Sequence, residues 1–443
     1  MKSLLFLAFA ATLAAAAPRP NVVFFLIDDL GYADCGFNGG TDIKTPIIDK
    51  LAAQGAILEN HYVQPVCSPT RSCLMTGRYV SHTGVYTIVR PHAKWGLPLE
   101  ERTLANALKD AGYTTAITGK WHLGEFEDAY KPTSRGFEHQ HGHYFGAIDY
   151  FTHVRDGSHD WYHDDKELKE EGYSTHLVAN EAVRLIQEQS ADKPLFLYMP
   201  FNGVHSPMQV PESYLQPYGA LTGGRKQLAG MLAAVDEAIG QVVAALEKKG
   251  LRENTLIVFS ADNGGPPPGS NTPLRDFKGS IYEGGVRGAA FANWPGKIPG
   301  GQRLTAPMHI IDWYPTLVKL AGGSLEQKLP LDGRDVWPVL TEKAASPHEA
   351  ILCVQSPDNA ALRMGDWKLI VSNGTVVDDE APKKKKAKAK AKGRKYEPVM
   401  LFNLAADPSE KTNLAAKEPE RVATMKAKLA ELLKDAVPSG VKP

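Results

Sequence analysis

The chain has 443 residues, of which 43% are hydrophobic and 23% charged, and 50 basic residues balance 50 acidic ones. A chain of this length can bury one large core and a smaller one, and its composition is that of a globular protein. Because the formal net charge is zero, we expect neither a nucleic acid nor an anionic membrane surface as a partner.

The N-terminus predicts export. Lys2 precedes an apolar run from Leu4 to Leu13, and Ala14 to Ala17 follow that run. This order of charged, apolar and small residues is typical of a signal peptide, and the run is too short to cross a membrane. We expect residues 1–17 to be removed from a secreted or periplasmic protein that has no stable membrane anchor. A buried N-terminal helix is the alternative.

Residues 21–27 (Asn-Val-Val-Phe-Phe-Leu-Ile) are apolar without alternation, which predicts a buried central strand. Three later segments then each predict a helix followed by a strand. They are residues 103–111 and 114–118, residues 174–189 and 195–199, and residues 225–249 and 255–260. This alternation predicts an α/β fold with a parallel sheet and helices on both of its faces.

Polar residues follow each of these predicted strands. They are Asp28 and Asp29, then Lys120 and His122, then His205, and finally Asp262 and Asn263. In an open α/β sheet, ligands bind at the carboxyl ends of the strands. The sequence therefore predicts a binding site at this edge of the sheet.

The two acidic pairs, Asp28-Asp29 and Asp262-Asn263, predict a divalent metal site. Their hard oxygen ligands suit Ca²⁺ or Mg²⁺ better than zinc. Without a cation, carboxylates packed together would repel one another and their pKa values would rise. Either pair alone could be a turn or a helix cap, but two pairs at one sheet edge favour a metal.

Arg71, Lys120 and Lys278 are candidate cations for the same pocket. Beside a divalent metal they would suit a tetrahedral dianion, whose charge they could stabilise as it moves between oxygens. His122 and His205 titrate near neutral pH, as acid–base catalysis requires. Taken singly, each of these five residues could be an ordinary surface or structural residue.

The segment Cys67-Ser68-Pro69-Thr70-Arg71, with Thr76-Gly77-Arg78 behind it, begins a short apolar stretch that predicts a helix. Helix amides and an arginine near Cys67 would activate a nucleophile or hold an anion. The only other cysteines are Cys35, Cys73 and Cys353, which are few for an exported disulfide-bonded protein. A Cys67–Cys73 disulfide is the alternative; if Cys67 is modified instead, at most one bridge is possible.

The character of the chain changes after about residue 345. Residues 350–354, 367–371 and 401–404 predict short strands, with Asp366 as a turn between the first two, and residues 419–437 predict a helix. We expect a catalytic domain over residues 18–345 and a small α+β domain over residues 346–443. Within the latter, residues 383–395 are almost entirely Lys, Arg and Ala, which predicts a solvated surface loop or a patch for polyanions.

Several segments together resemble the sulfatase family. Cys67 to Arg71 with Thr76-Gly77-Arg78, and Gly112 to Thr115 leading to Gly119 to Gly124, resemble the two family motifs, and Asp262 to Gly265 and Glu283 to Gly288 are similar to further family segments. The resemblance runs from Asn21 to Leu414. Lys193 to Tyr198, Val204-His205 and Asp236-Glu237-Ala238 are similar to the arylsulfatase B (N-acetylgalactosamine-4-sulfatase) branch. The Lys-rich run departs from the family pattern.

The resemblance implies an alkaline-phosphatase-like fold, with a mixed, mostly parallel sheet flanked by helices and a small C-terminal antiparallel sheet. It also implies a set of site residues. Asp28, Asp29, Asp262 and Asn263 would bind Ca²⁺ together with position 67, where Cys67 would be converted to formylglycine by a maturation enzyme. Arg71 would steady the hydrated side chain, Lys120 would bridge it to the sulfate, and His122 would hydrogen-bond the diol. His205 and Lys278 would bind sulfate and serve the leaving oxygen.

The expected chemistry is hydrolysis of a sulfate ester. One hydroxyl of a hydrated aldehyde would attack sulfur, His205 would protonate the leaving alcohol, and His122 would deprotonate the second hydroxyl so that sulfate is expelled. The implied substrate is an aryl sulfate or a sulfated carbohydrate such as N-acetylgalactosamine 4-sulfate, and algal galactans or fucans are alternatives.

Residues 139–144 and 149–151, with Trp161, could line a sugar site, and zinc binding by the histidines among them is the alternative. Two other functions remain open. One is a phosphodiester or phosphonate hydrolase of the same superfamily, and the other is a sulfated-glycan-binding protein in which Cys67 stays a thiol.

Overall fold

The computed structural model describes residues 19–190, 192–373, 375–376 and 394–440. The predicted signal peptide over residues 1–17 and most of the Lys-rich run, residues 383–393, lie outside the described residues.

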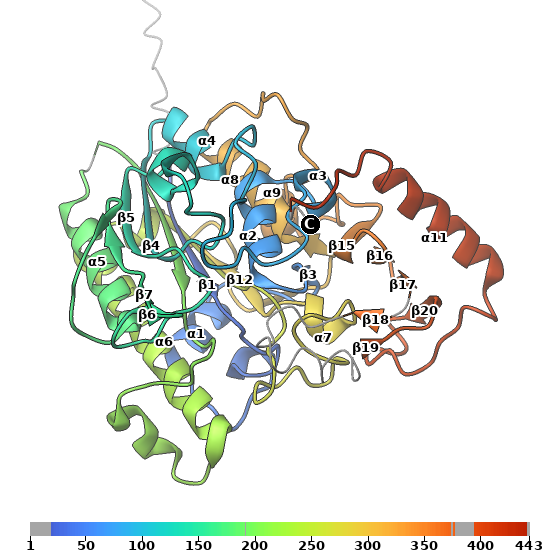
Figure 1. Ribbon diagram of the computed structural model, residues 1–443, viewed down its shortest axis with the longest axis horizontal. Coiled ribbons are helices and arrows are strands. Elements are labelled where there is room, and N and C mark those ends of the chain that lie inside the picture. Colours follow the sequence, from blue (N-terminus) through green and yellow to red (C-terminus); the bar gives the residue numbers. More distant parts are fainter. Residues whose placement is uncertain (1–18, 191, 374, 377–393, 441–443) are drawn as a thin grey trace, which may run out of the picture.

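A ten-stranded sheet forms the centre of the described chain (Figure 1). From one edge to the other its strands are β13 (Gln302–Leu304), β2 (Ala56–Leu58), β12 (Ala290–Asn293), β11 (Thr255–Ala261), β1 (Asn21–Ile27), β10 (Leu195–Phe201), β4 (Thr114–Lys120), β5 (His139–His143), β8 (Tyr162–His163) and β9 (Lys166–Glu167). From β11 to β5 all neighbours are parallel, whereas β12, β8 and β9 are antiparallel to theirs. The predicted mixed, mostly parallel sheet is confirmed.

Helices cover both faces of this sheet, which explains why β1 is apolar without alternation. Phe24 and Leu26 of β1 belong to one core, with helices α2 (Cys67–Thr76), α4 (Leu104–Asp110) and α8 (Trp313–Leu320). Phe25 and Ile27 point to the other core, with α1 (Pro46–Ala53), α5 (Ser174–Glu188) and α6 (Gly223–Lys248). By length and composition α6 could cross a membrane, but 67% of its most apolar window is buried in the protein.

Short elements complete the part of the protein built on the ten-stranded sheet. The remaining helices are α3 (Val80–Thr83), α7 (Glu283–Val286) and α9 (Trp337–Glu342), and the 3₁₀ turns are Gly36–Asn38, Asp128–Tyr130, Pro132–Arg135, Glu212–Tyr218, Arg252–Asn254 and Ile310–Asp312. Two small ribbons pair β14 (Met308–His309) with β3 (His61–Tyr62) and β6 (Val154–Arg155) with β7 (Ser158–His159).

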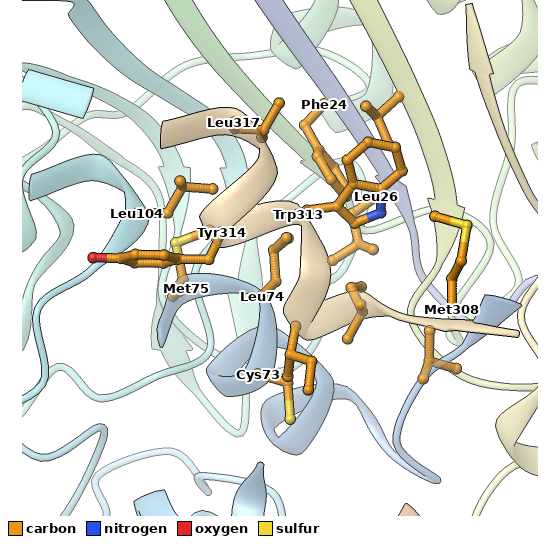
Figure 2. Packing of buried hydrophobic residues seen from close by; sticks show 14 of the residues in the cluster. Phe24, Leu26, Cys73, Leu74, Met75, Leu104, Met308, Trp313, Tyr314 and Leu317 are labelled. Carbon is orange, nitrogen blue, oxygen red and sulfur yellow. The ribbon is translucent and has the colours of Figure 1, made fainter. Parts of the chain in front are cut away.

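Helix α2 is buried along its whole length. Figure 2 shows Leu74 and Met75 of α2 beside Trp313 and Tyr314 of α8, within the core that also holds Phe24 of β1. Because the helix is enclosed by apolar contacts, the position of its first residue, Cys67, is fixed relative to the central strand.

The C-terminal part is built on a four-stranded antiparallel sheet, in the order β15 (Ile351–Ser356), β16 (Asn359–Met364), β17 (Trp367–Ser372) and β20 (Val399–Asn403). A ribbon of β18 (Thr375–Val376) and β19 (Arg394–Lys395) flanks the Lys-rich run. Helix α11 (Pro419–Leu432) lies alongside this sheet, and the following segment returns to α3, where Val437 N–H donates to the Ser81 carbonyl at 2.7 Å (Figure 1). The predicted small antiparallel sheet is confirmed.

Three sequence predictions need correction. Lys120 is the last residue of β4 rather than a residue beyond it, because β4 continues beside β5 to that point. Strand β16 was not predicted, and the turn at Asp366 joins β16 to β17. Helix α11 ends at Leu432 rather than near Val437, since Val437 bonds to α3 instead of continuing the helix.

A buried ion cluster joins the two parts of the protein. Lys368 of β17 lies 2.8 Å from Glu283 of α7 and 2.9 Å from Glu410, and all three side chains are almost completely buried. Tyr62 donates to Glu283 at 2.8 Å, and Arg363 donates to the Tyr62 hydroxyl at 2.5 Å. We call Glu283, Lys368 and Glu410 the Lys368 ion cluster.

Candidate active site

The predicted polar residues gather at the carboxyl edge of four adjacent strands. Asp28 and Asp29 follow β1, His205 lies just beyond β10, Lys120 ends β4, and Asp262 and Asn263 follow β11. Backbone bonds fix this register: Asp28 N–H donates to the Gly203 carbonyl at 3.0 Å, and Asp262 N–H donates to the Ile27 carbonyl at 3.1 Å. The sheet therefore brings together, at one edge, the residues that the sequence placed after these strands.

The carboxylates of Asp28, Asp29 and Asp262 lie among cations. Arg71 Nη2 is 2.9 Å from Asp262 Oδ2 and 3.4 Å from Asp28 Oδ2, and Lys120 Nζ pairs with Asp28. Lys278 Nζ is 2.8 Å from Asp29 Oδ1. Asp28, Asp262, Arg71 and Lys120 are all 0% exposed, so these charges interact without screening by water.

The two fully buried carboxyls of the site, Asp28 and Asp262, have pKa values shifted in opposite directions. Burial opposes ionisation of Asp28, but Lys120, His205, Arg71 and Lys278 outweigh it and hold the pKa of Asp28 below its usual value. Burial and the neighbouring charge of Asp28 raise the pKa of Asp262 to about 7. Burial and the charge of a neighbouring carboxylate thus oppose ionisation of Asp262, and a further positive charge nearby would favour it.

The donor atoms also fit a hard cation. Asp28 Oδ1 and Asn263 Oδ1 are buried and have no hydrogen-bond partner among the described residues. Two groups of candidate ligands have their atoms within 4.8 Å of one another, Asp28 with Cys67 and Asp262, and Asp28 with Asp29 and His205. Carboxylate and amide oxygens are the ligands that Ca²⁺ and Mg²⁺ prefer. The residues present could hold such an ion.

Cys67 is the first residue of α2 and is 0% exposed. All four cysteines are free, so the alternative Cys67–Cys73 disulfide is wrong. Arg71 lies one turn further along the same helix, and its Nη1 donates to the Lys120 carbonyl at 3.0 Å. One helix thus presents both the candidate nucleophile and a cation to the carboxylate cluster.

His205 faces the site with a defined tautomer. Its Nδ1 is 2.6 Å from the Ser206 carbonyl, which can only accept, so Nδ1 carries a proton. Its Nε2 is then the nitrogen directed at Asp29, 3.6 Å from Oδ2. Asn202, beside it at the end of β10, is 5% exposed, and both polar atoms of its amide lack partners in the described part of the chain. These groups could bind a polar ligand.

Two hydrogen bonds of its own backbone fix the position of His122. Its N–H donates to the Tyr144 carbonyl at 3.0 Å, and its own carbonyl accepts from Ser68 of α2 at 2.9 Å. Gly146 lies against the imidazole, since a Cβ there would be 2.6 Å from Nε2. The structure thus ties His122 to the helix that carries Cys67.

Asp160 is a positioning residue that the sequence analysis missed. Its two carboxylate oxygens accept from Tyr144 N–H at 3.0 Å and Phe145 N–H at 2.7 Å, which fixes the loop beside His122. Burial raises the pKa of Asp160 to about 7 despite these two bonds. Nothing in the local sequence around Asp160 indicates this role, because its partners lie about fifteen residues earlier in the chain.

The histidines of β5 do not form a metal centre. His141 Nε2 lies 2.9 Å from Glu170, which also accepts from Trp161 at 2.8 Å, and His143 Nδ1 is 3.0 Å from the Phe145 carbonyl. Within the described residues, both groups close enough to hold an ion contain Asp28, and neither includes these histidines. The alternative zinc site is not supported.

Comparison with known proteins agrees with this geometry. A family model described as Sulfatase matches residues 20–324, and one described as C-terminal region of aryl-sulfatase matches residues 346–440. Arylsulfatase J of Mus musculus is 36% identical over 463 residues, which cover 96% of this chain and 77% of that protein. N-acetylgalactosamine-6-sulfatase of Mus musculus is 33% identical over 395 residues, covering 82% of this chain and 74% of that protein.

Among solved structures, that of Ps i-CgsB in complex with k-i-k-neocarrahexaose has a TM-score of 0.85 and 32% identity, and covers 95% of this chain and 94% of that chain. Fold, site and comparisons together define a sulfuric ester hydrolase. The chain belongs to the sulfatase family.

Proposed function

We propose that this sulfatase removes sulfate from a sulfated carbohydrate, using a formylglycine made from Cys67 and a bound Ca²⁺. One observation carries the proposal: the Cys67 sulfur lies within 4.8 Å of the Asp28 and Asp262 carboxylate oxygens. A thiolate there would be repelled by the acids, and it would be one soft ligand in a set of hard oxygens. Replacing the sulfur by the oxygens of a hydrated aldehyde makes the donor set consistent.

The aldehyde hydrate would supply a hydroxyl nucleophile and a second hydroxyl whose deprotonation releases sulfate. Asp28, Asp29, Asp262 and Asn263 would hold the Ca²⁺, which would polarise the sulfate oxygens. Arg71 would orient the modified side chain from within α2.

Lys120 and Lys278 would stabilise the charge on the sulfate oxygens, as cations buried beside the acids can. His122 would accept the proton of the second hydroxyl. His205, protonated on both ring nitrogens, would keep its Nδ1 proton on the Ser206 carbonyl and would deliver its Nε2 proton to the leaving oxygen.

Mass spectrometry of the tryptic peptide that carries Cys67 tests the proposal directly. Active protein from its natural source should contain an aldehyde or its hydrate at position 67. An alkylatable thiol in fully active protein would overturn the mechanism. The same measurement on protein from a host without a formylglycine-generating enzyme should find the thiol and little activity, which tests the proposed maturation partner.

The role of His205 predicts a dependence on the leaving group. In H205A, hydrolysis of a sugar sulfate should slow about 10²–10⁴-fold, because an alcohol needs a proton to leave. Hydrolysis of 4-nitrophenyl sulfate should slow much less, because nitrophenolate leaves without protonation. Rates for both substrates in H205A and the wild-type protein check this. Equal losses on both would assign His205 to sulfate binding rather than to proton transfer.

For the substrate we propose an amino sugar such as N-acetylgalactosamine 4-sulfate. The support is the likeness to a relative named N-acetylgalactosamine-6-sulfatase and to a protein solved with k-i-k-neocarrahexaose. Sulfate release from the 4-sulfate, the 6-sulfate and a sulfated galactan would rank the candidates. A phosphodiester that is hydrolysed faster than every sulfate ester would favour the alternative function as a phosphodiester or phosphonate hydrolase.

We also propose export through the N-terminal signal peptide over residues 1–17.

A further inference from the structure

An open hollow of about 640 Å³ lies where the C-terminal part meets the loop that leads to Lys278. Its size is within the range of pockets that bind small molecules. It is lined by Thr272, Pro273, Leu274, Arg275, Ser409 and Lys411. We call it the Arg275 hollow. None of its lining residues belongs to the metal or sulfate site described above.

The walls of the hollow are braced from both sides. The Ser409 hydroxyl donates to the Pro273 carbonyl at 2.7 Å, which joins the two segments across it. Arg275 Nη1 donates to the Glu410 carbonyl at 2.6 Å, and its guanidinium stacks 3.8 Å from the centre of the Tyr282 ring. The exposed Arg275 head is thus held in one place before any ligand arrives, which lowers the entropic cost of binding.

The two cations of the hollow differ from several partly exposed arginines of the protein. Arg102, Arg184 and Arg225 each pair with an aspartate or glutamate. Among the described residues neither Arg275 nor Lys411 forms an ion pair with a carboxylate, although both are exposed and share one concave surface. A planar guanidinium held in place beside a lysine is suited to bind sulfate or carboxylate.

Backbone hydrogen bonds connect Arg275 in the wall of the hollow to the residues that follow Asn263 of the candidate site. Gly264, directly after Asn263, donates to the Gly285 carbonyl at 3.0 Å, and Gly284 N–H donates to the Arg275 carbonyl at 2.8 Å. A side chain at Gly264 would collide with the Gly284 carbonyl, so the backbone segments around Gly264 and Gly284 are in close contact. Lys278 follows Arg275 by only three residues. Three residues of chain span at most about 11 Å, so the hollow lies within the reach of an oligosaccharide bound near Lys278.

We propose that the Arg275 hollow binds a second anionic group, a sulfate or a carboxylate, of the same saccharide chain whose sulfate ester is hydrolysed at position 67. This inference rests on the proposed function and narrows it. The natural substrate is then an oligosaccharide or polysaccharide with more than one negative charge, rather than a singly sulfated small molecule.

The test compares R275Q/K411Q with a matched control, R421Q/K426Q. Arg421 also stacks on an aromatic ring, 4.1 Å from the centre of Trp367, but it lies on α11 outside the hollow, as does Lys426. The probes are 4-nitrophenyl sulfate, a chondroitin 4-sulfate tetrasaccharide that carries carboxylates and sulfates, and a carrageenan tetrasaccharide whose only anions are sulfates.

R275Q/K411Q should raise KM about tenfold for an oligosaccharide, with kcat unchanged and with kcat/KM for 4-nitrophenyl sulfate within twofold of wild type. The difference should shrink as salt is added. An effect on chondroitin sulfate alone would assign the hollow to a carboxylate, and an effect on carrageenan would assign it to a sulfate. The control variant should behave like the wild type with all three probes.

Three results would overturn the inference. They are an equal loss on the aryl sulfate, unchanged kinetics on both oligosaccharides, and a wild-type protein that hydrolyses the aryl sulfate but neither hydrolyses nor binds either oligosaccharide. Titration of the inactive C67S protein separates this from the proposed function. If wild type hydrolyses no sulfate ester, the proposed function fails, whereas oligosaccharide binding by C67S that is lost in C67S/R275Q/K411Q would keep the hollow as a binding site.

Discussion

Asp29 and His122 both have left-handed backbone conformations, with φ of 61° and 59°. Such values are uncommon outside glycine and cost roughly 1–2 kcal/mol for an ordinary residue. Both residues belong to the candidate site, where the fold holds them by the contacts of Asp28 with Gly203 and of His122 with Tyr144. The strained backbone aims these side chains away from the direction that a regular strand would give them.

The space beside His122 predicts a sensitive glycine. In G146A the new methyl group would overlap the imidazole and displace it. We expect kcat for 4-nitrophenyl sulfate to fall about tenfold to a hundredfold, because small misplacements of a catalytic group are costly. Thermal melting should change little. G219A is the control, since a Cβ at Gly219 meets no atom within 4 Å. Unchanged kcat in G146A would exclude a catalytic role that depends on this ring position.

Metal removal should destabilise the protein. A chelator should lower the melting temperature, and added Ca²⁺ should restore it, since a ligand at a hundred times its Kd adds about 2.7 kcal/mol to the free energy of unfolding. The response should be greatly reduced in N263A, which removes one proposed ligand. D110N, which changes an exposed carboxylate paired with Arg102, should respond like wild type. An identical calcium response in N263A would contradict the proposed ligand set.

At the scale of elements, helix α2 depends on its apolar packing. Leu74 is 0% exposed and packs in the core shown in Figure 2, so L74A should lower the free energy of unfolding by about 2–5 kcal/mol. L99A removes a side chain that is 46% exposed and should stay within about 0.5 kcal/mol of wild type. Urea unfolding of both variants checks this. Equal stabilities would mean that α2 does not rely on this core.

Elements with a strong local pattern could be predicted from the sequence. Strands β1 and β11 are buried throughout and mostly apolar because helices cover both faces of the sheet, and polar residues directly after them mark the site edge. The short strand β16 escaped prediction because its residues Asn359 and Arg363 interrupt the apolar pattern. Its stability comes from pairing with β15 and β17 instead.

The parts of the site that could not be predicted depend on contacts between distant residues. Ser68 reaches the His122 carbonyl across 54 positions, and no local pattern indicates that bond. Asp160 likewise accepts hydrogen bonds from the backbone of Tyr144 and Phe145, which lie 16 and 15 residues earlier in the chain. The sequence could identify the charged and titratable residues, but the atoms that orient them became visible only in the fold.

At the scale of the whole molecule, the Lys368 ion cluster should make the stability of the protein depend on pH. Burial raises the pKa of Glu410 to about 7, with the charge of Glu283 adding to the effect and Lys368 opposing it. The contribution of Glu410 to stability is therefore complete below its ordinary pKa of 4.5 and is lost as the pH rises through about 7.

Replacing Glu410 should flatten this dependence. Between pH 5 and pH 8 the melting temperature of E410Q should fall less than that of wild type, because glutamine does not titrate. Other buried carboxyls with raised pKa values, such as Asp160, contribute equally to both proteins, so the difference between the two curves isolates Glu410. E420Q, at an exposed position of α11, should follow wild type. Parallel curves for E410Q and wild type would show that the cluster does not titrate in this range.

The complete enclosure of Cys67 would set the order of events in its proposed conversion to formylglycine. A maturation enzyme would have to reach this side chain, yet in the folded protein it is 0% exposed at the start of a helix that is buried along its whole length. The proposed oxidation would therefore take place on a chain that has not yet closed around α2. A molecule that folded with its thiol intact would stay inactive, so the yield of active enzyme would depend on whether modification or folding is faster.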